Sequence, residues 1–493
     1  MKQCNISSVT WSFPFKKKEI IKSEYIDLLH HDIPIFYSYT DSLDLIDSRG
    51  HKYSNFFEDT GYQVVMNKIK HLTQAEVNRQ ISVMKVSLGV YPSMVSKPVY
   101  HETLASIVSV QKTRSIEERE IFIREAERIS DLLLDEAFID QDSNLISWLT
   151  VNPKNKDQWN IGPVDGTFYD GLSGMTLFFY YLYRLTNKAK YERIYRIVLN
   201  SAEHKIKEFP NVSGFTGRAS LLYPLRKILA NEKEDRLARV LNEIIEDCDR
   251  QYKTLDQYDW VGGTASLVYQ FLDHYLTTRN LDALTLSIKL GNLLIQQLDE
   301  NDEPMSGFAH GASSLALVLI RLGEIAKNRK FKERGLMLLE YDRSKINAGK
   351  EDSTINDGIF KESWCHGTTG VGLSRIKLSR IYTDPWLDDE IDRSIYDLFK
   401  SKFHGDDCLC HGNMGSTELF LSKYEVSGEK RYLYTARKIA IDIINKAEKR
   451  GHYQVRSIPG FTAIGLFTGL SGIGYQLLRL ADHKTVPSVL TLD

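Results

Sequence analysis

The chain has 493 residues, of which 42% are hydrophobic, and its 63 basic and 65 acidic side chains give a formal net charge of −2. This length is enough for a large core, and the near-neutral charge argues against an electrostatic nucleic-acid surface. The N-terminus lacks a charged-then-apolar signal pattern, and no apolar run reaches the roughly 18 residues of a membrane helix. The cysteines are Cys4, Cys248, Cys365, Cys408 and Cys410. They are too few and too clustered for a disulfide framework, so we expect a cytoplasmic protein with thiols or metal ligands.

Residues 1–115 form a first segment, in which we expect mainly helices. Its cluster Lys16-Lys17-Lys18 is interpreted as a solvated surface, because charge runs usually are. The segment has no recognisable glycine-rich phosphate loop and no kinase-type cluster of Asp and Asn. We therefore do not expect phosphoryl-transfer chemistry from it.

From residue 116 onward the chain contains seven short glycine turns, each followed by an apolar run. The second residues of successive turns lie 46, 46, 48, 56, 45 and 57 residues apart. A period of this size indicates a repeat architecture of paired helices. The turns are Asp170–Gly174, Thr216–Ser220, Gly262–Ser266, His310–Ser314, His366–Gly370, His411–Gly415 and Thr468–Gly472.

The runs after the turns predict one inner and one outer helix per repeat. Met175–Leu182 is apolar nearly all round, whereas Arg431–Ala447 is amphipathic. An open solenoid and a closed α/α toroid both fit this pattern. In an open array Asp170 would lie too far from His310 and His411 to share one small site. We therefore favour a closed all-α toroid of seven inner and seven outer helices, with the active site where the inner helices begin.

Cysteine and histidine occupy equivalent turns in two adjacent repeats. The motifs Trp364-Cys365-His366-Gly367 and Cys410-His411-Gly412 place thiolate and imidazole donors in one register. Two thiolates and an imidazole suit zinc, and a set of three protein ligands leaves the open position typical of a catalytic site. We predict Cys365, Cys410 and His411 as the ligands. Cys408 is a weaker alternative, since it lacks their register.

The other two cysteines are interpreted without a metal role. Cys248 lies within a helical pattern and reads as a core residue, and Cys4 reads as incidental.

Three further side chains precede the first glycine of their turns. His310, His366 and Asp170 are expected at the same mouth as the predicted ligands. Histidine titrates near neutral pH and can move a proton, so His310 is the first candidate acid or base. For Asp170, a helix cap is an equally good interpretation.

These motifs together resemble the lanthionine synthetase C-like cyclases, over roughly residues 116–493. The matching stretches are Tyr169–Gly174, Gly307–Gly311, Trp364–Gly367 and Cys410–Asn413. The resemblance implies a seven-repeat toroid with zinc held by Cys365, Cys410 and His411, and acid, base or orienting roles for His310, Asp170 and His366. The chain departs from the family pattern at Ser314 and at Thr368-Thr369, none of which is an expected ligand.

The N-terminal segment carries a second resemblance. Stretches such as Leu28–Phe36 and Arg79–Leu88 are similar to the last part of the dehydratase region of class II bifunctional lanthionine synthetases. Only this C-terminal remnant of that region is present in residues 1–115. The resemblance therefore implies a cyclase without dehydratase activity.

The expected reaction is addition of a cysteine thiol to dehydroalanine or dehydrobutyrine within a ribosomal precursor peptide, which closes a thioether ring and makes a lantibiotic. The partners implied are that peptide and, beyond it, a dehydratase or export machinery. Two alternatives remain open. A non-catalytic zinc-containing scaffold could bind peptide for a partner dehydratase, and an α/α-barrel carbohydrate-active enzyme would need paired carboxylates at the mouth, where the turns offer only Asp170.

Overall fold

The structure is a computed structural model. It describes residues 18–88, 103–104, 115–140, 142–155, 158–301, 303–347, 361–402, 405–455, 457–458 and 461–493. Cys4 and the first two lysines of the Lys16–Lys18 cluster lie outside these residues. The chain forms two compact units, Met1–Ile81 and Ser82–Asp493.

The first unit is mainly helical in its described part but also contains a small sheet. A 3₁₀ turn (η1, Lys18–Ile20) leads into α2 (Ile21–Leu29), and α3 (Gly61–Lys70) and the start of α4 (Gln74–Ser87) follow the sheet. The strands β1 (Phe36–Tyr37), β2 (Leu45–Asp47) and β3 (Lys52–Tyr53) are antiparallel in the order β1-β2-β3. The buried Asp47 carboxylate accepts hydrogen bonds from the Ser23 hydroxyl at 2.7 Å and the His51 amide at 2.8 Å, and so joins α2 to the sheet.

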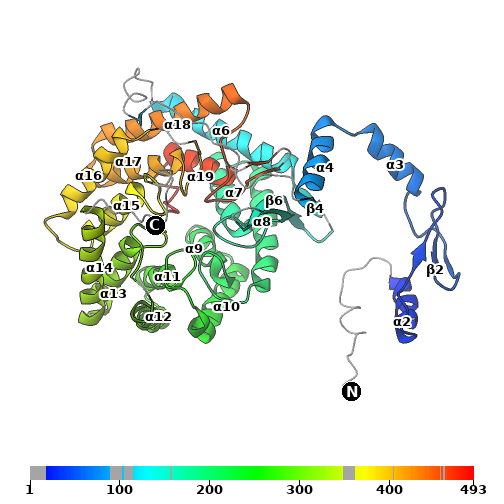
Figure 1. Cartoon of the computed structure of the whole chain (residues 1–493), viewed down its shortest axis with the longest axis horizontal. Helices are drawn as coiled ribbons and strands as arrows, with labels where there is room; N and C mark the ends of the chain where they lie inside the picture. The colour runs from blue at the N-terminus through cyan, green and yellow to red at the C-terminus, as the bar shows by residue number, and fades with distance from the viewer. Residues whose placement is uncertain are drawn as a thin grey trace. The chain divides into compact units, whose positions relative to one another are not determined.

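The second unit is a ring of helix pairs (Figure 1). The inner helices are α7 (Leu172–Thr186), α9 (Leu222–Leu229, after the 3₁₀ turn η3, Arg218–Leu221), α11 (Thr264–Thr278), α13 (Ala312–Ala326), α15 (Thr368–Ser379), α17 (Asn413–Ser427) and α19 (Leu470–Ala481). Six outer helices follow their inner partners: α8 (Ala189–Lys205), α10 (Asp235–Gln251), α12 (Leu281–Glu300), α14 (Arg329–Asn347), α16 (Leu387–Lys400) and α18 (Lys430–Arg450). Two further 3₁₀ turns, η2 (Ile206–Glu208) and η4 (Tyr252–Thr254), follow α8 and α10.

The seventh outer helix comes from the opposite end of the repeat region. Helix α6 (Ser115–Asp135) precedes the first repeat and packs on α19, the last inner helix. The inner helices contact one another in sequence, and α19 also contacts α7. The predicted toroid of seven inner and seven outer helices is thus confirmed, with one outer helix donated from before the first turn.

Hydrogen bonds link the loops before the inner helices around the ring, through the backbone at most junctions and through the Ser213 hydroxyl and the Val261 carbonyl between the second and third repeats. The Ala309 amide donates to the Cys365 carbonyl at 3.0 Å, and the Cys410 amide donates to the Phe467 carbonyl at 2.9 Å. The Phe467 amide then donates to the Tyr169 carbonyl at 2.9 Å, which joins the seventh repeat to the first. An open solenoid cannot make this last bond. The turns therefore converge on one mouth.

Close packing requires the glycine before the inner helix at Gly171, Gly217, Gly263, Gly311, Gly412 and Gly469. Gly171 caps α7 in an extended conformation, and a Cβ there would lie 2.2 Å from Oδ1 of Asp165 and 2.4 Å from the amide of Thr167. A side chain would push the loop off the helix. This contact explains the glycine period of the sequence.

The second unit also contains short β-hairpins. They pair β4 (Phe138–Asp140) with β5 (Leu145–Ser147), β6 (Leu149–Asn155) with β7 (Gln158–Pro163), and β8 (Ser457–Ile458) with β9 (Phe461–Thr462), all antiparallel. Within the described residues, we find no helix with the length and apolar character needed to span a bilayer.

Candidate metal and active site

Aromatic side chains from the ring loops pack together and support the mouth. All are fully buried: Phe168, Phe215, Trp260, Phe308, Trp364 and Phe467. Ring centroids of neighbours lie 5.1 Å apart for Phe168 and Phe215, and 5.2 Å apart for Trp364 and Phe467. The loops that carry the polar site residues are thus fixed on a rigid apolar layer.

Cys365 and Cys410 meet in the mouth, as the shared register predicted. Both are buried, and the Cys365 amide donates a hydrogen bond to the Cys410 carbonyl at 3.4 Å. The neighbouring Cys410 side chain lowers the pKa of Cys365 against the effect of burial, with help from the nearby His366. Cys365, together with burial, raises the pKa of Cys410 well above its ordinary value. Two buried thiols side by side are donors that suit a soft metal ion.

His411 lies beside a second group of donors that the sequence analysis did not propose as a set. Its Nε2 atom is 3.4 Å from Oδ2 of Asp406, and one donor atom each of Asp406, Cys408 and His411 lie within 4.8 Å of one another. Cys408 raises the pKa of Cys410 by its charge, so the two cysteines are electrostatically coupled. His411 thus belongs to two overlapping candidate sets, the predicted Cys365, Cys410 and His411, and the alternative Asp406, Cys408 and His411.

Asp259 is a site residue that sequence reasoning missed. Its Oδ2 atom lies 2.7 Å from Nδ1 of His310, whose side chain is 33% exposed. Burial lowers the pKa of His310, but the hydrogen bond and charge of Asp259 outweigh it, so the pKa of His310 lies above its ordinary value. Asp259 stands two residues before Val261, the third repeat's counterpart of Cys365. Asp259 thus lies outside the register that Cys365, Cys410 and Tyr169 share, which is why the repeat pattern did not point to it.

His310 and His366 face each other across adjacent loops. Their rings stack with centroids 5.2 Å apart and an interplanar angle of 27°. Gly307, in the His310 loop, has a φ of +99°, and a Cβ there would lie 2.6 Å from Cα of His366. A glycine is therefore needed both for the backbone conformation and for the approach of the two loops.

Asp170 lies in a ring loop and accepts hydrogen bonds from the neighbouring repeat. Its carboxylate accepts hydrogen bonds from the Thr468 amide at 2.9 Å and the Thr468 hydroxyl at 2.6 Å. These contacts tie the first repeat to the seventh, and the residue that caps α7 is Gly171 rather than Asp170. Its catalytic role stays a prediction.

Tyr169 is a second residue that sequence reasoning missed. Its hydroxyl donates a hydrogen bond to the sulfur of Cys410 at 3.0 Å. Burial and the charge of Cys410 raise the pKa of Tyr169 well above its ordinary value, so it remains a donor. Tyr169 holds in the first repeat the register of Cys365 and Cys410, a pattern visible in the sequence.

The remaining cysteine prediction concerns Cys248. It is fully buried in α10, and burial raises the pKa of its thiol. Cys248 is therefore a core residue, as expected.

Comparison with known proteins supplies the family. Residues 162–491 match the family model described as lanthionine synthetase C-like protein. The chain is 24% identical to the lacticin 481/lactococcin biosynthesis protein LcnDR2 of Lactococcus lactis subsp. lactis, over 96% of this chain and 52% of that protein. It is 25% identical to the glutathione S-transferase LANCL1 of Danio rerio, over 36% of this chain and 43% of that protein. The chain thus spans about half the length of the curated relatives it matches.

The solved structure of nisin cyclase shares the fold. It superimposes with a TM-score of 0.54 at 14% sequence identity, over 66% of this chain and 92% of that one. The family match covers most of the toroid, including every turn with a predicted site residue. The chain belongs to the lanthionine synthetase C-like family.

Proposed function

We propose that this chain is a zinc-dependent cyclase that adds cysteine thiols of a ribosomal precursor peptide to dehydroalanine or dehydrobutyrine, forming lanthionine or methyllanthionine rings. The observation that carries the proposal is the buried Cys365–Cys410 pair in the mouth, close to His366 and to the Asp259-bonded His310. Family membership and the similarity to a lacticin 481/lactococcin biosynthesis protein support the same reaction.

The donor set fits zinc. Cys365 and Cys410 are buried side by side, and His411 follows Cys410 directly in the chain, so the three supply two thiolates and an imidazole. The His411 ring lies beside Asp406 and Cys408 in this structure, and it would turn toward the two cysteines to complete the set. When bound, zinc would activate the substrate thiol by lowering its pKa from about 8.5. Tyr169 would stabilise the Cys410 thiolate through its hydroxyl.

Residues of this chain would carry out the proton transfers. The substrate sulfur forms a bond to the β-carbon of the dehydro residue. The electron pair of the double bond moves onto the α-carbon and its carbonyl group, which gives an enolate. His310 is the acid that protonates the α-carbon, since Asp259 raises its pKa and keeps more of the imidazole protonated near neutral pH. His366, stacked on His310, is the second candidate for this proton transfer. The proton that the substrate thiol loses replaces the proton that the imidazole gives to the α-carbon. The addition therefore balances without a redox cofactor or nucleotide.

We also propose a division of the chain into two parts. We assign the cyclase to residues 116–493, which is supported by the packing of α6 on α19, and a dehydratase-like remnant to residues 1–115. A separate dehydratase, or export machinery, would supply or receive the peptide in the cytoplasm. The chain matches about half of the length of LcnDR2.

The test uses the purified full chain and a precursor peptide that already contains dehydro residues and cysteines. Ring closure removes free thiols without changing the peptide mass, so fewer alkylation adducts measure it. Zinc in the protein without any loss of thiols would favour the peptide-binding scaffold instead. The unmodified peptide with ATP and magnesium should not lose about 18 Da per Ser or Thr, because the kinase-like core is not recognisable in the sequence.

A further inference from the structure

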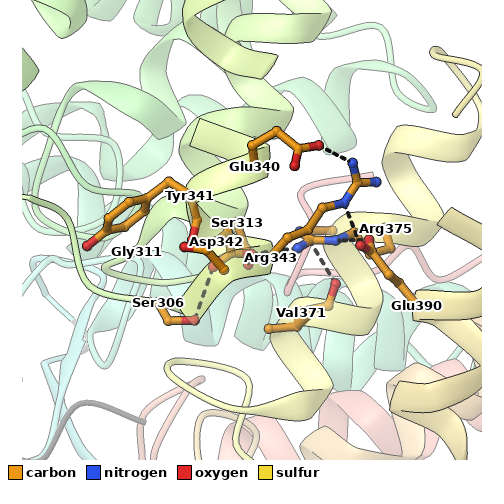
Figure 2. Close-up of polar contacts among 12 residues, drawn as sticks. Ser306, Gly311, Ser313, Glu340, Tyr341, Asp342, Arg343, Val371, Arg375 and Glu390 are labelled. Atoms are coloured by element: carbon orange, nitrogen blue, oxygen red, sulfur yellow. Dashed lines mark hydrogen bonds and ion pairs between the residues drawn. The ribbon is translucent and has the colours of Figure 1, made fainter. Parts of the chain in front are cut away.

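A buried carboxylate on an outer helix reaches the loop that carries His310. Asp342 of α14 is fully buried, and its Oδ1 atom accepts a hydrogen bond from Ser306 at 3.0 Å. Its Oδ2 atom accepts hydrogen bonds from Ser313 at 2.5 Å and from Nη2 of Arg375 at 2.7 Å. Figure 2 shows Asp342 in contact with Ser306, with Arg375 and Arg343 nearby.

The two serines bracket His310. Ser306 lies four residues before it and Ser313 three residues after it, in the first turn of α13. Within the loop, the Ser313 amide donates to the Gly307 carbonyl at 3.1 Å. Asp342 therefore holds both ends of a short loop that is closed on itself, and the only histidine between those ends is His310.

Arg375 carries the same connection to the next repeat. It is fully buried on α15, the inner helix that begins directly after Cys365, His366 and Gly367. Its Nε atom donates to Glu390 of α16 at 2.8 Å, and Glu390 also accepts from Arg343 at 2.5 Å. Asp342 and Arg375 thus join the His310 loop to α15, the helix that follows the Cys365 and His366 loop. The imidazoles of His310 and His366 stack between these two loops.

Stability alone does not account for this ion pair. Removing two charges from water costs several kcal/mol per ion, and well-packed apolar residues often stabilise a core as much as a buried pair does. What apolar residues cannot supply is directional bonds to two hydroxyls and a guanidinium. The geometry therefore favours a role in orientation.

We propose that Asp342 is a positioning residue for His310, acting through Ser306 and Ser313 and anchored to the neighbouring repeat by Arg375. This inference rests on the proposed function, in which His310 protonates the product carbon. The clamp sets the distance between the His310 loop and the His366 loop and keeps the His310 ring on Asp259.

The main test is the double variant Ser306→Ala/Ser313→Ala, because it frees the loop and leaves the Asp342–Arg375 pair intact. We expect unchanged zinc content, a KM for the dehydrated peptide within about twofold, and a kcat reduced about 10- to 100-fold, as for an ångström-scale displacement of a catalytic group. Asp342→Asn should show the same split if it folds. With ¹⁵N-histidine labelling, the Nδ1 proton signal of His310, assigned by its loss in His310→Ala, should shift or broaden in the double variant.

Ser374→Ala is the matched control. The Ser374 hydroxyl is also fully buried and accepts a hydrogen bond from Nη1 of Arg375 at 3.0 Å, but it does not touch the His310 loop. Its kcat should stay within about twofold of the parent, with an unmoved His310 signal. Equal losses of kcat in Ser374→Ala and the double variant, or an unchanged His310 signal in the double variant, would overturn the proposal. If the parent chain closes no rings, the proposed function fails, whereas the His310 signal still reports whether Asp342 sets its position.

Discussion

Two groups of ring loops have the same backbone arrangement but different side-chain contacts. One group belongs to the fourth to sixth repeats, and the other lies at the junction of the first and seventh repeats. Both are capped by an extended glycine, and both join the ring through the same backbone hydrogen bonds. At the junction, the Asp170 carboxylate is engaged by Thr468. In the fourth to sixth repeats, His310 and Cys365 instead face side chains of other loops across the mouth.

Glycine and backbone hydrogen bonds therefore form the ring. We propose that the side chains next to the first glycine of each turn determine which loops take part in the chemistry. Where those side chains bond across a seam, they contribute stability. Where they face one another across the mouth, we propose that they act as acid, base or metal donors. Changes in the two regions should therefore separate activity from stability.

The largest effect is expected from the thiol pair. Cys365→Ala or Cys410→Ala should remove zinc and reduce ring closure to background, since each change leaves two of three protein ligands. Elemental analysis of the metal-replete protein, with the alkylation assay, measures both.

Cys408→Ala is the matched control, because Cys408 is equally buried two residues from Cys410. It should retain zinc. Loss of the metal in Cys408→Ala but not in Cys410→Ala would instead identify Asp406, Cys408 and His411 as the ligands.

His310→Ala should come next, with zinc retained and ring closure slowed by roughly 10² to 10⁴, the usual range for a lost general acid. Because His310 and the predicted ligands lie in different repeats, metal binding and proton transfer should separate. Loss of zinc in His310→Ala would show that this imidazole is a ligand and that the metal has no open position.

Asp259→Asn should have a smaller effect with a distinct pH signature. Asp259 raises the pKa of His310, so the acid form persists to higher pH in the parent chain. Removing the charge lowers that pKa, and the decline in kcat with rising pH should begin at lower pH. At acidic pH the variant should approach the parent rate. A pH profile parallel to that of the parent would show that Asp259 does not act through His310.

The ring could be predicted from the sequence because a glycine turn marks the start of each inner helix. The seven glycine turns give the starts of the inner helices within a few residues, and the chemistry of three turns required convergence. The sequence did not reveal that α6 completes the outer layer, because this helix lies before the first turn and its pairing with α19 spans the whole repeat region. The strands of the first unit are two or three residues long, too short to show alternation.

For the site, residue type and register identified Cys365, Cys410, His310 and His366 as neighbours. Their partners were harder to find, because Asp259 and His310 are 51 residues apart and Tyr169 and Cys410 are 241 apart. Contacts at such separations depend on which loops the ring places side by side. A search restricted to the repeat register would have proposed Tyr169, but no pattern in one sequence predicts the reach of Asp342 from an outer helix.

The smallest effect on activity, and the clearest on stability, is expected at the junction of the first and seventh repeats. Asp170→Ala removes the acceptor of two hydrogen bonds from Thr468, and hydrogen bonds to a charged group contribute about 1.5–3 kcal/mol each before solvent exposure reduces them. The thermal midpoint should fall while zinc stays bound. Thr468→Val removes only the hydroxyl donor and should lower the midpoint less. If Asp170 is only a clasp, both variants keep kcat within about tenfold of the parent. A loss of kcat in Asp170→Ala as large as that in His310→Ala, with an unchanged midpoint, would instead move Asp170 into the group of residues that transfer protons.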